Sequence, residues 1–169
     1  MDYLGASGRG ARNTRLPGES QFGNVTCCYG THLRAVSQED AATIRRAYEV
    51  WNESGPAAVV EQFWAEDAVY REGPGWPDAG VYRGRAAALE RMQSLIDLVG
   101  PIEVRIDDLI DLGDGRLIAC VRMLGESATS DTPYTQTFAV VQRLRDGLVV
   151  EADYYLDRAA ALEAVGLRE

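Results

Sequence analysis

The sequence contains no lysine and a single histidine, and these two absences exclude much of the common enzyme chemistry. All 17 basic residues of the 169-residue chain are arginines, and the one histidine is His32. Schiff-base chemistry at a lysine is therefore impossible, and we do not expect a Ser-His-Asp triad, a Cys-His pair or a histidine-rich zinc site. Aspartate, glutamate and tyrosine are the residues left for proton transfer.

Cysteines, long apolar runs and net positive charge are also scarce. Cys27 and Cys28 are adjacent and Cys120 stands apart, so the sequence has neither a disulfide framework nor a CxxC metal motif. No apolar run approaches the roughly 20 residues that span a bilayer, and the first residues lack the apolar core of a secretory signal. A formal net charge of −9 argues against a nucleic-acid partner. We expect a cytoplasmic protein without a metal or cofactor that binds neither membranes nor nucleic acid.

The composition divides the chain into a short extension and one domain. Residues 1–36 are rich in Gly, Arg, Ser, Asn and Thr and show no helical or strand period, which predicts a flexible N-terminal extension. Residues 37–169 carry the periodic apolar segments, and their length suits one globular domain.

The domain begins with helices and continues as strands. Apolar spacing predicts a helix that ends at Gly55, a second from Pro56 to about residue 64, and a third from about residue 85 to Gly100. A strand is expected at 67–72. Gly-Asp-Gly and Arg-Asp-Gly turns then predict two hairpins, over 102–124 and 135–156, before a last short helix at 157–167. This order predicts an α+β fold in which a curved antiparallel sheet wraps around three N-terminal helices and leaves a cone with an apolar pocket.

Several segments carry a family resemblance. The runs "SQEDAATIRRAYEVWNESG", "FWAEDAVYREGPGWPDAGVYRGRAAAL", "LIDLGDGRLIACVRMLG" and "LRDGLVVEADYYLDRAAALEAVGL" occur in order over about residues 37–168. Together they resemble the SnoaL-like branch of the nuclear-transport-factor-2-like superfamily. The superfamily includes ketosteroid isomerases, limonene-epoxide hydrolases, polyketide cyclases and transport adaptors. The resemblance therefore implies one fold, the cystatin-like α+β fold, but does not single out one reaction. Members often begin with a Met-Ser-Gln-Glu-like run, and "VSQED" gives the hypothesis that residues 1–35 are absent from the native product.

The resemblance implies a catalytic carboxylate on the first strand. In ketosteroid isomerases the base lies five residues after the aspartate that opens this strand, which corresponds to Glu72, and an enolate-stabilising tyrosine corresponds to Tyr48. In related epoxide hydrolases a Tyr and an Asn that hold water correspond to Tyr70 and Glu72. A glutamate among apolar and aromatic groups would have its pKa raised and could exchange protons. The alternatives are a core role for Tyr48 and a solvent-facing strand-end position for Glu72.

Other positions depart from the family pattern. The second acid of the isomerases corresponds to about Val140, and the Arg-x-Asp pair of the hydrolases to Val121 and Met123, so both charged sets are missing. The acid that cyclases carry on the last strand corresponds to Tyr154. In a regular strand Tyr154 faces the pocket and Asp153 faces the opposite side of the sheet, whereas a bulge would turn Asp153 toward the pocket instead.

The remaining candidates have a structural alternative. Trp76 either closes the cavity mouth or covers the helices. Asp107 and Asp108 indicate a bulge or a solvated edge rather than a metal site. The residues expected to line the pocket or to form the core are Phe63, Trp64, Val121, Met123, Phe138 and Val140.

These patterns predict a protein that binds a small hydrophobic molecule, such as a polyketide-like or terpenoid carbonyl compound. As an enzyme it would transfer a proton next to the carbonyl, with Glu72 as base and Tyr48, Tyr70 or Tyr154 as hydrogen-bond donors. The alternative is a non-catalytic ligand-binding or dimerisation module, and epoxide hydrolysis is a weaker third. Thr137, Ala139 and Val141 alternate on the outer sheet face and predict a homodimer through that face.

Overall fold

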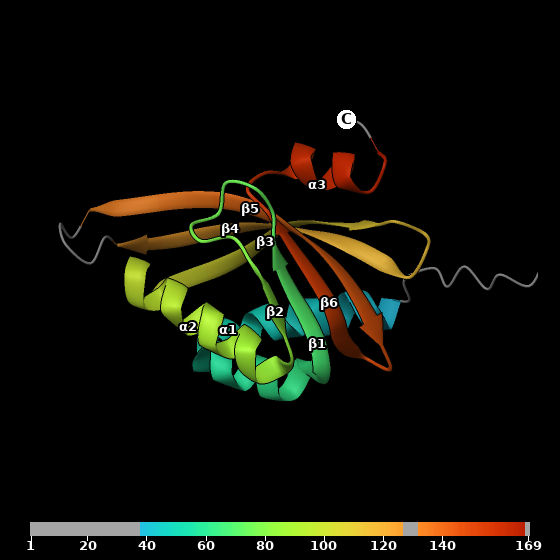
Figure 1. Cartoon of the computed structure of the whole chain (residues 1–169), viewed down its shortest axis with the longest axis horizontal. Coiled ribbons are helices and arrows are strands. Elements are labelled where there is room, and N and C mark those ends of the chain that lie inside the picture. The colour runs from blue at the N-terminus through green and yellow to red at the C-terminus, as the bar shows by residue number, and fades with distance from the viewer. Residues whose placement is uncertain (1–37, 127–131, 168–169) are drawn as a thin grey trace, which may run out of the picture. The chain divides into compact units, whose positions relative to one another are not determined.

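The computed structural model describes residues 38–126 and 132–167, so the predicted extension 1–36 lies outside the described residues. Helices α1 and α2 lie on one side of a curved sheet, and α3 lies on the other (Figure 1). In chain order the elements are α1 (Gln38–Phe63), β1 (Trp64–Glu72), β2 (Val81–Arg83), α2 (Arg85–Val99), β3 (Ile102–Asp111), β4 (Arg116–Glu126), β5 (Pro133–Arg145), β6 (Leu148–Tyr155) and α3 (Arg158–Ala164).

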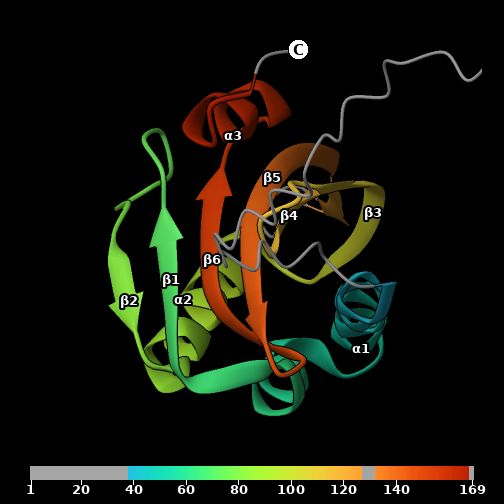
Figure 2. The ribbon, with the colours of Figure 1, turned by 90° about the vertical axis from the view of Figure 1, so that its right-hand side faces the viewer.

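The six strands form one open sheet in the order β2-β1-β6-β5-β4-β3 (Figure 2). Both predicted hairpins, β3-β4 and β5-β6, are present, and all neighbours are antiparallel except β1 and β6, which run parallel. The predicted α+β fold with a curved sheet around the N-terminal helices is confirmed. The parallel pair joins strands that are far apart in the sequence, because β2, α2 and β3 to β5 lie between β1 and β6 in the chain.

The hairpin turns use backbone conformations that suit their residues. Asp146 and Gly147, between β5 and β6, have φ values of 53° and 76°. Positive φ at both central residues belongs to the type I′ turn, whose twist matches that of the flanking strands. At the predicted bulge in β3, the pairing with β4 shifts between Ile106 and Asp108, and the expectation for this segment is confirmed.

Helix α1 is bent at Gly55, as the sequence predicts. Gly55 has φ 78° and ψ −178°, a conformation outside the helical region that glycine adopts easily. Pro56 follows it and has no backbone N–H to donate. The bend directs both halves toward the sheet, with Ile44 and Val50 buried before it and Val60 buried after it.

Helix α3 covers part of the outer sheet face. Ala139 and Val141 are buried there with Ile118 of β4 and with Ala161 and Leu162 of α3. The assumption that Ala139 and Val141 are free to pack against a second copy is therefore wrong, because the chain's own last helix occupies that position. The homodimer itself stays a prediction.

Two further points concern the helices and the shortest strand. None of the helices in the described ranges is both long and apolar enough to cross a membrane. Strand β2, which pairs with β1 at residues 69–71, is missing from the sequence prediction because it is only three residues long.

Replacing Leu162 with Ala should destabilise the domain, because this side chain is 6% exposed between α3 and the sheet. We expect the free energy of unfolding to fall by about 2–4 kcal/mol through lost burial and the cavity left behind. Urea unfolding measures it. Leu167→Ala is the matched control, since Leu167 is 45% exposed; equal losses in both variants would contradict the packing of α3.

Candidate functional site

A cavity of about 450 Å³ lies between α1, α2 and the concave face of the sheet. Its lining is mostly apolar, and the lining side chains that carry polar atoms able to form hydrogen bonds are those of tyrosine, tryptophan and glutamine. The lining residues used below are Ala47, Tyr48, Trp64, Tyr70, Gly75, Trp76, Leu98, Met123, Gln136, Phe138, Gln142, Val149, Tyr154 and Leu156.

The cavity brings together most of the residues predicted for a site. Those that line it are Tyr48, Trp64, Tyr70, Trp76, Met123, Phe138 and Tyr154. Those that do not are Phe63, Glu72, Val121 and Val140. Val121 and Val140 are 1% and 0% exposed and belong to the core, which decides between the two roles left open for them.

Strand register explains which side chains face the cavity. Tyr154 of β6 is paired with Val140 on one side and with Glu72 on the other, with no irregularity next to it. Tyr154 therefore lies on the concave face, and Asp153 points outward, where its carboxylate accepts a hydrogen bond from Arg71 at 2.7 Å. Of the two residues left open by the sequence, Tyr154 is the one at the cavity.

Aromatic rings form one continuous wall. The rings of Tyr70 and Tyr154 stack with centroids 4.4 Å apart, and Phe138 stacks on the other side of Tyr154 at 6.0 Å. Trp76 meets both Phe138 and Tyr154 edge to face, at 5.9 and 6.1 Å, and Trp64 stacks on Tyr70 at 6.2 Å. Such a wall favours flat, unsaturated ligands.

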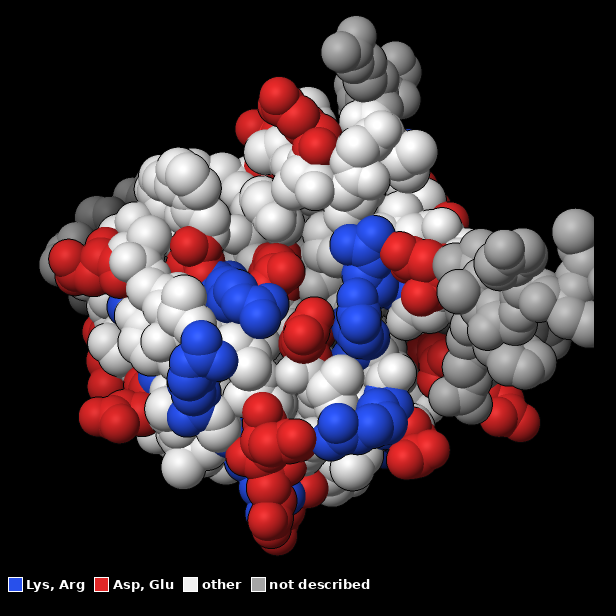
Figure 3. Space-filling view, turned by 45° about the vertical axis from the view of Figure 1, so that its right-hand side comes forward, with Lys and Arg blue, Asp and Glu red and all other residues white. Residues whose placement is uncertain are grey.

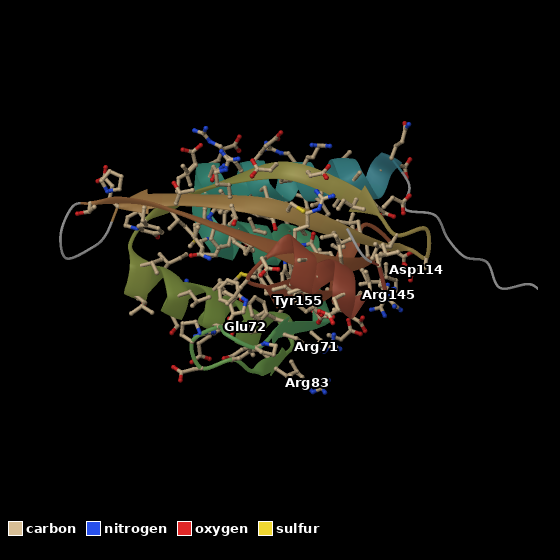
Figure 4. All side chains as sticks on the ribbon, turned by 90° about the horizontal axis from the view of Figure 1, so that it is seen from above. Arg71, Glu72, Arg83, Asp114, Arg145 and Tyr155 are labelled. Atoms are coloured by element: carbon tan, nitrogen blue, oxygen red, sulfur yellow. The ribbon has the colours of Figure 1, made fainter. Side chains whose placement is uncertain are left out.

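Glu72 lies beside this wall in a buried ion pair. Its side chain is 0% exposed, and the Nε of Arg91 donates to both carboxylate oxygens at 2.9 and 3.1 Å. The hydroxyl of Tyr70 donates to Glu72 Oε1 at 3.1 Å. Glu72 and Arg71 are neighbours in β1 with different surroundings (Figure 4), because Arg71 pairs with Asp153 and Glu151 of β6. Glu72 is thus neither solvent-facing nor on the cavity lining.

Arg91 also holds the loop between β1 and β2. Its Nη2 donates to the carbonyl of Pro77 at 2.6 Å, so one guanidinium joins α2, β1 and this loop. Burial lowers the pKa of Arg91, but the hydrogen bond and charge of Glu72 outweigh this, and the pKa ends above its usual value. Gly75 lets the loop approach Leu156, the residue after β6, because a Cβ there would lie 2.5 Å from the Leu156 side chain and the φ of Gly75 is +95°.

Three tyrosines line the cavity, and the two whose hydroxyl groups are not bonded to Glu72, Tyr48 and Tyr154, remain protonated at neutral pH. Burial raises the pKa of Tyr48, and burial together with the nearby Tyr48 and Glu72 raises the pKa of Tyr154. A neutral phenol donates its hydrogen bond to a carbonyl oxygen and is a poor base. The arrangement therefore suits binding and polarising a carbonyl group.

Charges on the outer face are paired with one another. Acidic and basic side chains alternate across one face of the molecule (Figure 3). Arg143 lies 3.8 Å from Glu151, and Arg145 lies 2.9 Å from Asp67. Among residues 38–126 and 132–167, no three His, Cys, Asp or Glu side chains gather as a metal site would require.

Sequence reasoning missed two polar residues of this region, Arg91 and Gln142. A buried carboxylate needs a partner, and with no lysine in the chain an arginine on the third predicted helix could have been proposed for Glu72. Gln142 lies on the same strand face as Phe138 and Val140, a period-two signal that would have placed it at the cavity.

Comparison with known proteins agrees with this geometry. Residues 44–152 match the model of the SnoaL-like domain, and no curated protein sequence matches the chain. An NTF2-like protein of unknown function from Burkholderia pseudomallei has a similar structure, with 17% identity, a TM-score of 0.62, and coverage of 76% of this chain and 98% of that one. A putative SnoaL-like polyketide cyclase from Jannaschia sp. has 15% sequence identity and a TM-score of 0.61, and the match covers 79% of this chain and 96% of that one. TerC, co-crystallised with polyporic acid, has 16% sequence identity and a TM-score of 0.60, and the match covers 76% of this chain and 98% of that one. At these identities the likeness shows the NTF2-like fold.

Replacing Arg91 with Met should strongly destabilise the domain, because it leaves the Glu72 carboxylate buried without its partner. We expect the free energy of unfolding to fall by about 3–5 kcal/mol, measured by urea unfolding. Arg46→Met is the matched control, since Arg46 pairs with Glu49 and Glu53 on the exposed side of α1 and should cost at most about 1 kcal/mol. An equal cost for the two variants would show that the buried pair is dispensable.

Proposed function

Because the chain belongs to the SnoaL-like domain family, we propose that it binds a small hydrophobic carbonyl compound in the cavity between α1, α2 and the sheet. The observation that carries the proposal is the cavity itself, about 450 Å³ with a mostly apolar lining. This volume lies in the range of sites for drug-sized ligands, which are lined mainly by apolar and aromatic side chains with a few polar groups.

The lining suggests how such a compound is held. The stacked rings of Tyr70, Tyr154 and Phe138 offer faces and edges to a ring system of the ligand. The phenols of Tyr48 and Tyr154 offer hydrogen-bond donors for its carbonyl oxygen, in surroundings where burial raises the pKa of both. Polyketide- and terpenoid-like compounds combine rings with carbonyl groups in this way. The structure of TerC with polyporic acid supports the proposal, since it pairs the same fold with a small organic compound.

A second candidate is proton transfer next to the carbonyl, with Glu72 as the base and Tyr48 and Tyr154 as donors to the enolate. One observation favours it: Tyr70 lines the cavity and donates a hydrogen bond to Glu72. A proton taken from the substrate by this route would pass through the phenol of Tyr70. Arg91 weighs against it, because its guanidinium occupies both oxygens of the carboxylate. Binding without turnover is therefore the function that we prefer.

Calorimetric titration with 4-phenylcyclohexanone and its hydrocarbon parent phenylcyclohexane tests the binding proposal. We expect both probes to bind, and we expect Tyr154→Phe to weaken the ketone by about fivefold through one lost hydrogen bond while the hydrocarbon is unaffected. Ala47→Leu, which fills part of the cavity, should weaken both probes. Ala42→Leu is the control, because Ala42 lies on the exposed side of α1. If neither probe binds the wild-type protein, the proposal fails.

Exchange of α-hydrogens for deuterium in 4-phenylcyclohexanone, followed by NMR, tests the proton-transfer alternative. If Glu72 is the base, the wild-type protein accelerates exchange and Glu72→Gln lowers the rate by about a hundredfold or more. Circular dichroism must show that the variant is folded, since it also changes the ion pair with Arg91. Our preferred function predicts the same slow exchange with both proteins and with buffer alone.

A further inference from the structure

A buried glutamine, Gln142, lies on the sheet side of the cavity. It is 4% exposed and is paired with Leu117 of β4 and Ala152 of β6. The other inward positions on this part of β5 are Phe138, Val140 and Leu144, all apolar. Gln142 is therefore an isolated polar side chain in an apolar strand face.

Gln142 lies in a buried part of the cavity. Along β5, the lining residue Gln136 is exposed and Gln142 is buried. Leu98 at the end of α2 also lines the cavity and is 66% exposed, whereas Val149 of β6, which pairs with Leu144, is 1% exposed. A ligand that enters from the side of Leu98 reaches Gln142 with its leading end.

Two polar atoms of cavity residues have no protein partner. Within the described residues, the buried side-chain atoms without a hydrogen bond are Gln142 Oε1, Trp76 Nε1 and Tyr134 Oη. Gln142 and Trp76 line the cavity, and Tyr134 does not. Buried polar atoms are nearly always paired in folded proteins. Both atoms are covered by protein, but both residues line the cavity, so a ligand there can supply the missing partner after a small rotation of each side chain.

The two groups are well separated. Trp76 contacts Phe138, with ring centroids 5.9 Å apart, and Gln142 lies four residues further along the same strand, about 13 Å at the rise of a β-strand. Beside this stretch of β5, on the neighbouring strand, lie Tyr154, which pairs with Val140, and Ala152, which pairs with Gln142.

From these positions we infer that the ligand is an elongated molecule that is polar at both ends and apolar between them. A carbonyl oxygen at the trailing end accepts from Trp76 Nε1, next to the phenol of Tyr154. A hydroxyl group at the leading end bonds the amide of Gln142, to which it can donate at Oε1 and from which it can accept at Nε2. Two linked or fused rings fill the space between. This inference rests on the proposed function and makes Gln142 and Trp76 specificity-determining residues.

Four matched two-ring probes test it by calorimetric titration: 4-(4-hydroxyphenyl)cyclohexanone, 4-phenylcyclohexanone, 4-cyclohexylphenol and phenylcyclohexane. In the wild-type protein, the hydroxyl group should tighten binding by about tenfold, the value of one good hydrogen bond. Gln142→Met, of similar length, should abolish this gain and leave 4-phenylcyclohexanone unchanged. Trp76→Phe should weaken the two ketones by about tenfold and leave 4-cyclohexylphenol unchanged. Gln62→Met, on the exposed side of α1, is the control.

The outcomes separate this inference from the proposed function. If phenylcyclohexane and the ketones bind but the hydroxyl group adds nothing in the wild-type protein, Gln142 is satisfied by water and the inference is overturned, whether or not the variants fold. A hydroxyl gain that survives in Gln142→Met overturns the assignment to this residue. If none of the four probes binds, the proposed function itself has failed.

Discussion

The buried ion pair between Glu72 and Arg91 is the contact on which the cavity wall depends. It joins the end of β1 to the middle of α2, and through the carbonyl of Pro77 it also ties down the loop that carries Trp76. Tyr70 donates to the same carboxylate, so the first ring of the aromatic wall is oriented by it. Two charges that are costly to bury thus hold β1, α2 and the loop together. The carboxylate of Glu72 lies outside the cavity lining, which is mostly apolar.

The chemistry of the cavity follows from how the sheet alternates its side chains. Inward positions carry the aromatic rings and Gln142, while outward neighbours such as Asp153 carry the charges and pair with arginines. The acid expected on the last strand is a phenol, Tyr154, on the inside. The protein thus keeps the enclosed shape of its fold and lines it with protonated phenols, which under the proposed function donate hydrogen bonds to a carbonyl group.

Much of the fold could be predicted from the sequence, because each element carries a local signal. Gly55 and Pro56 mark the bend in α1, and the turn at Asp146 and Gly147 fixes one hairpin. The site could be predicted only in part. Family spacing points to Tyr48 and Tyr154, which line the cavity. The partner of Glu72, Arg91, is 19 residues away on another element, and no local pattern marks it. The sequence also did not predict that α3 covers part of the outer sheet face. Small residues such as Ala139 can pack against a helix of the same chain as well as against a second copy.

The parallel pairing of β1 with β6 has a consequence for how the protein is made. Residues 64–72 meet residues 148–155, so the sheet that lines the cavity cannot be completed until residues 148–155 have left the ribosome. Until then the sheet that covers the apolar faces of α1 and α2 is incomplete. Contacts of such long sequence separation slow folding, and the nascent chain therefore exposes the residues of its future cavity for longer than a chain of hairpins alone would.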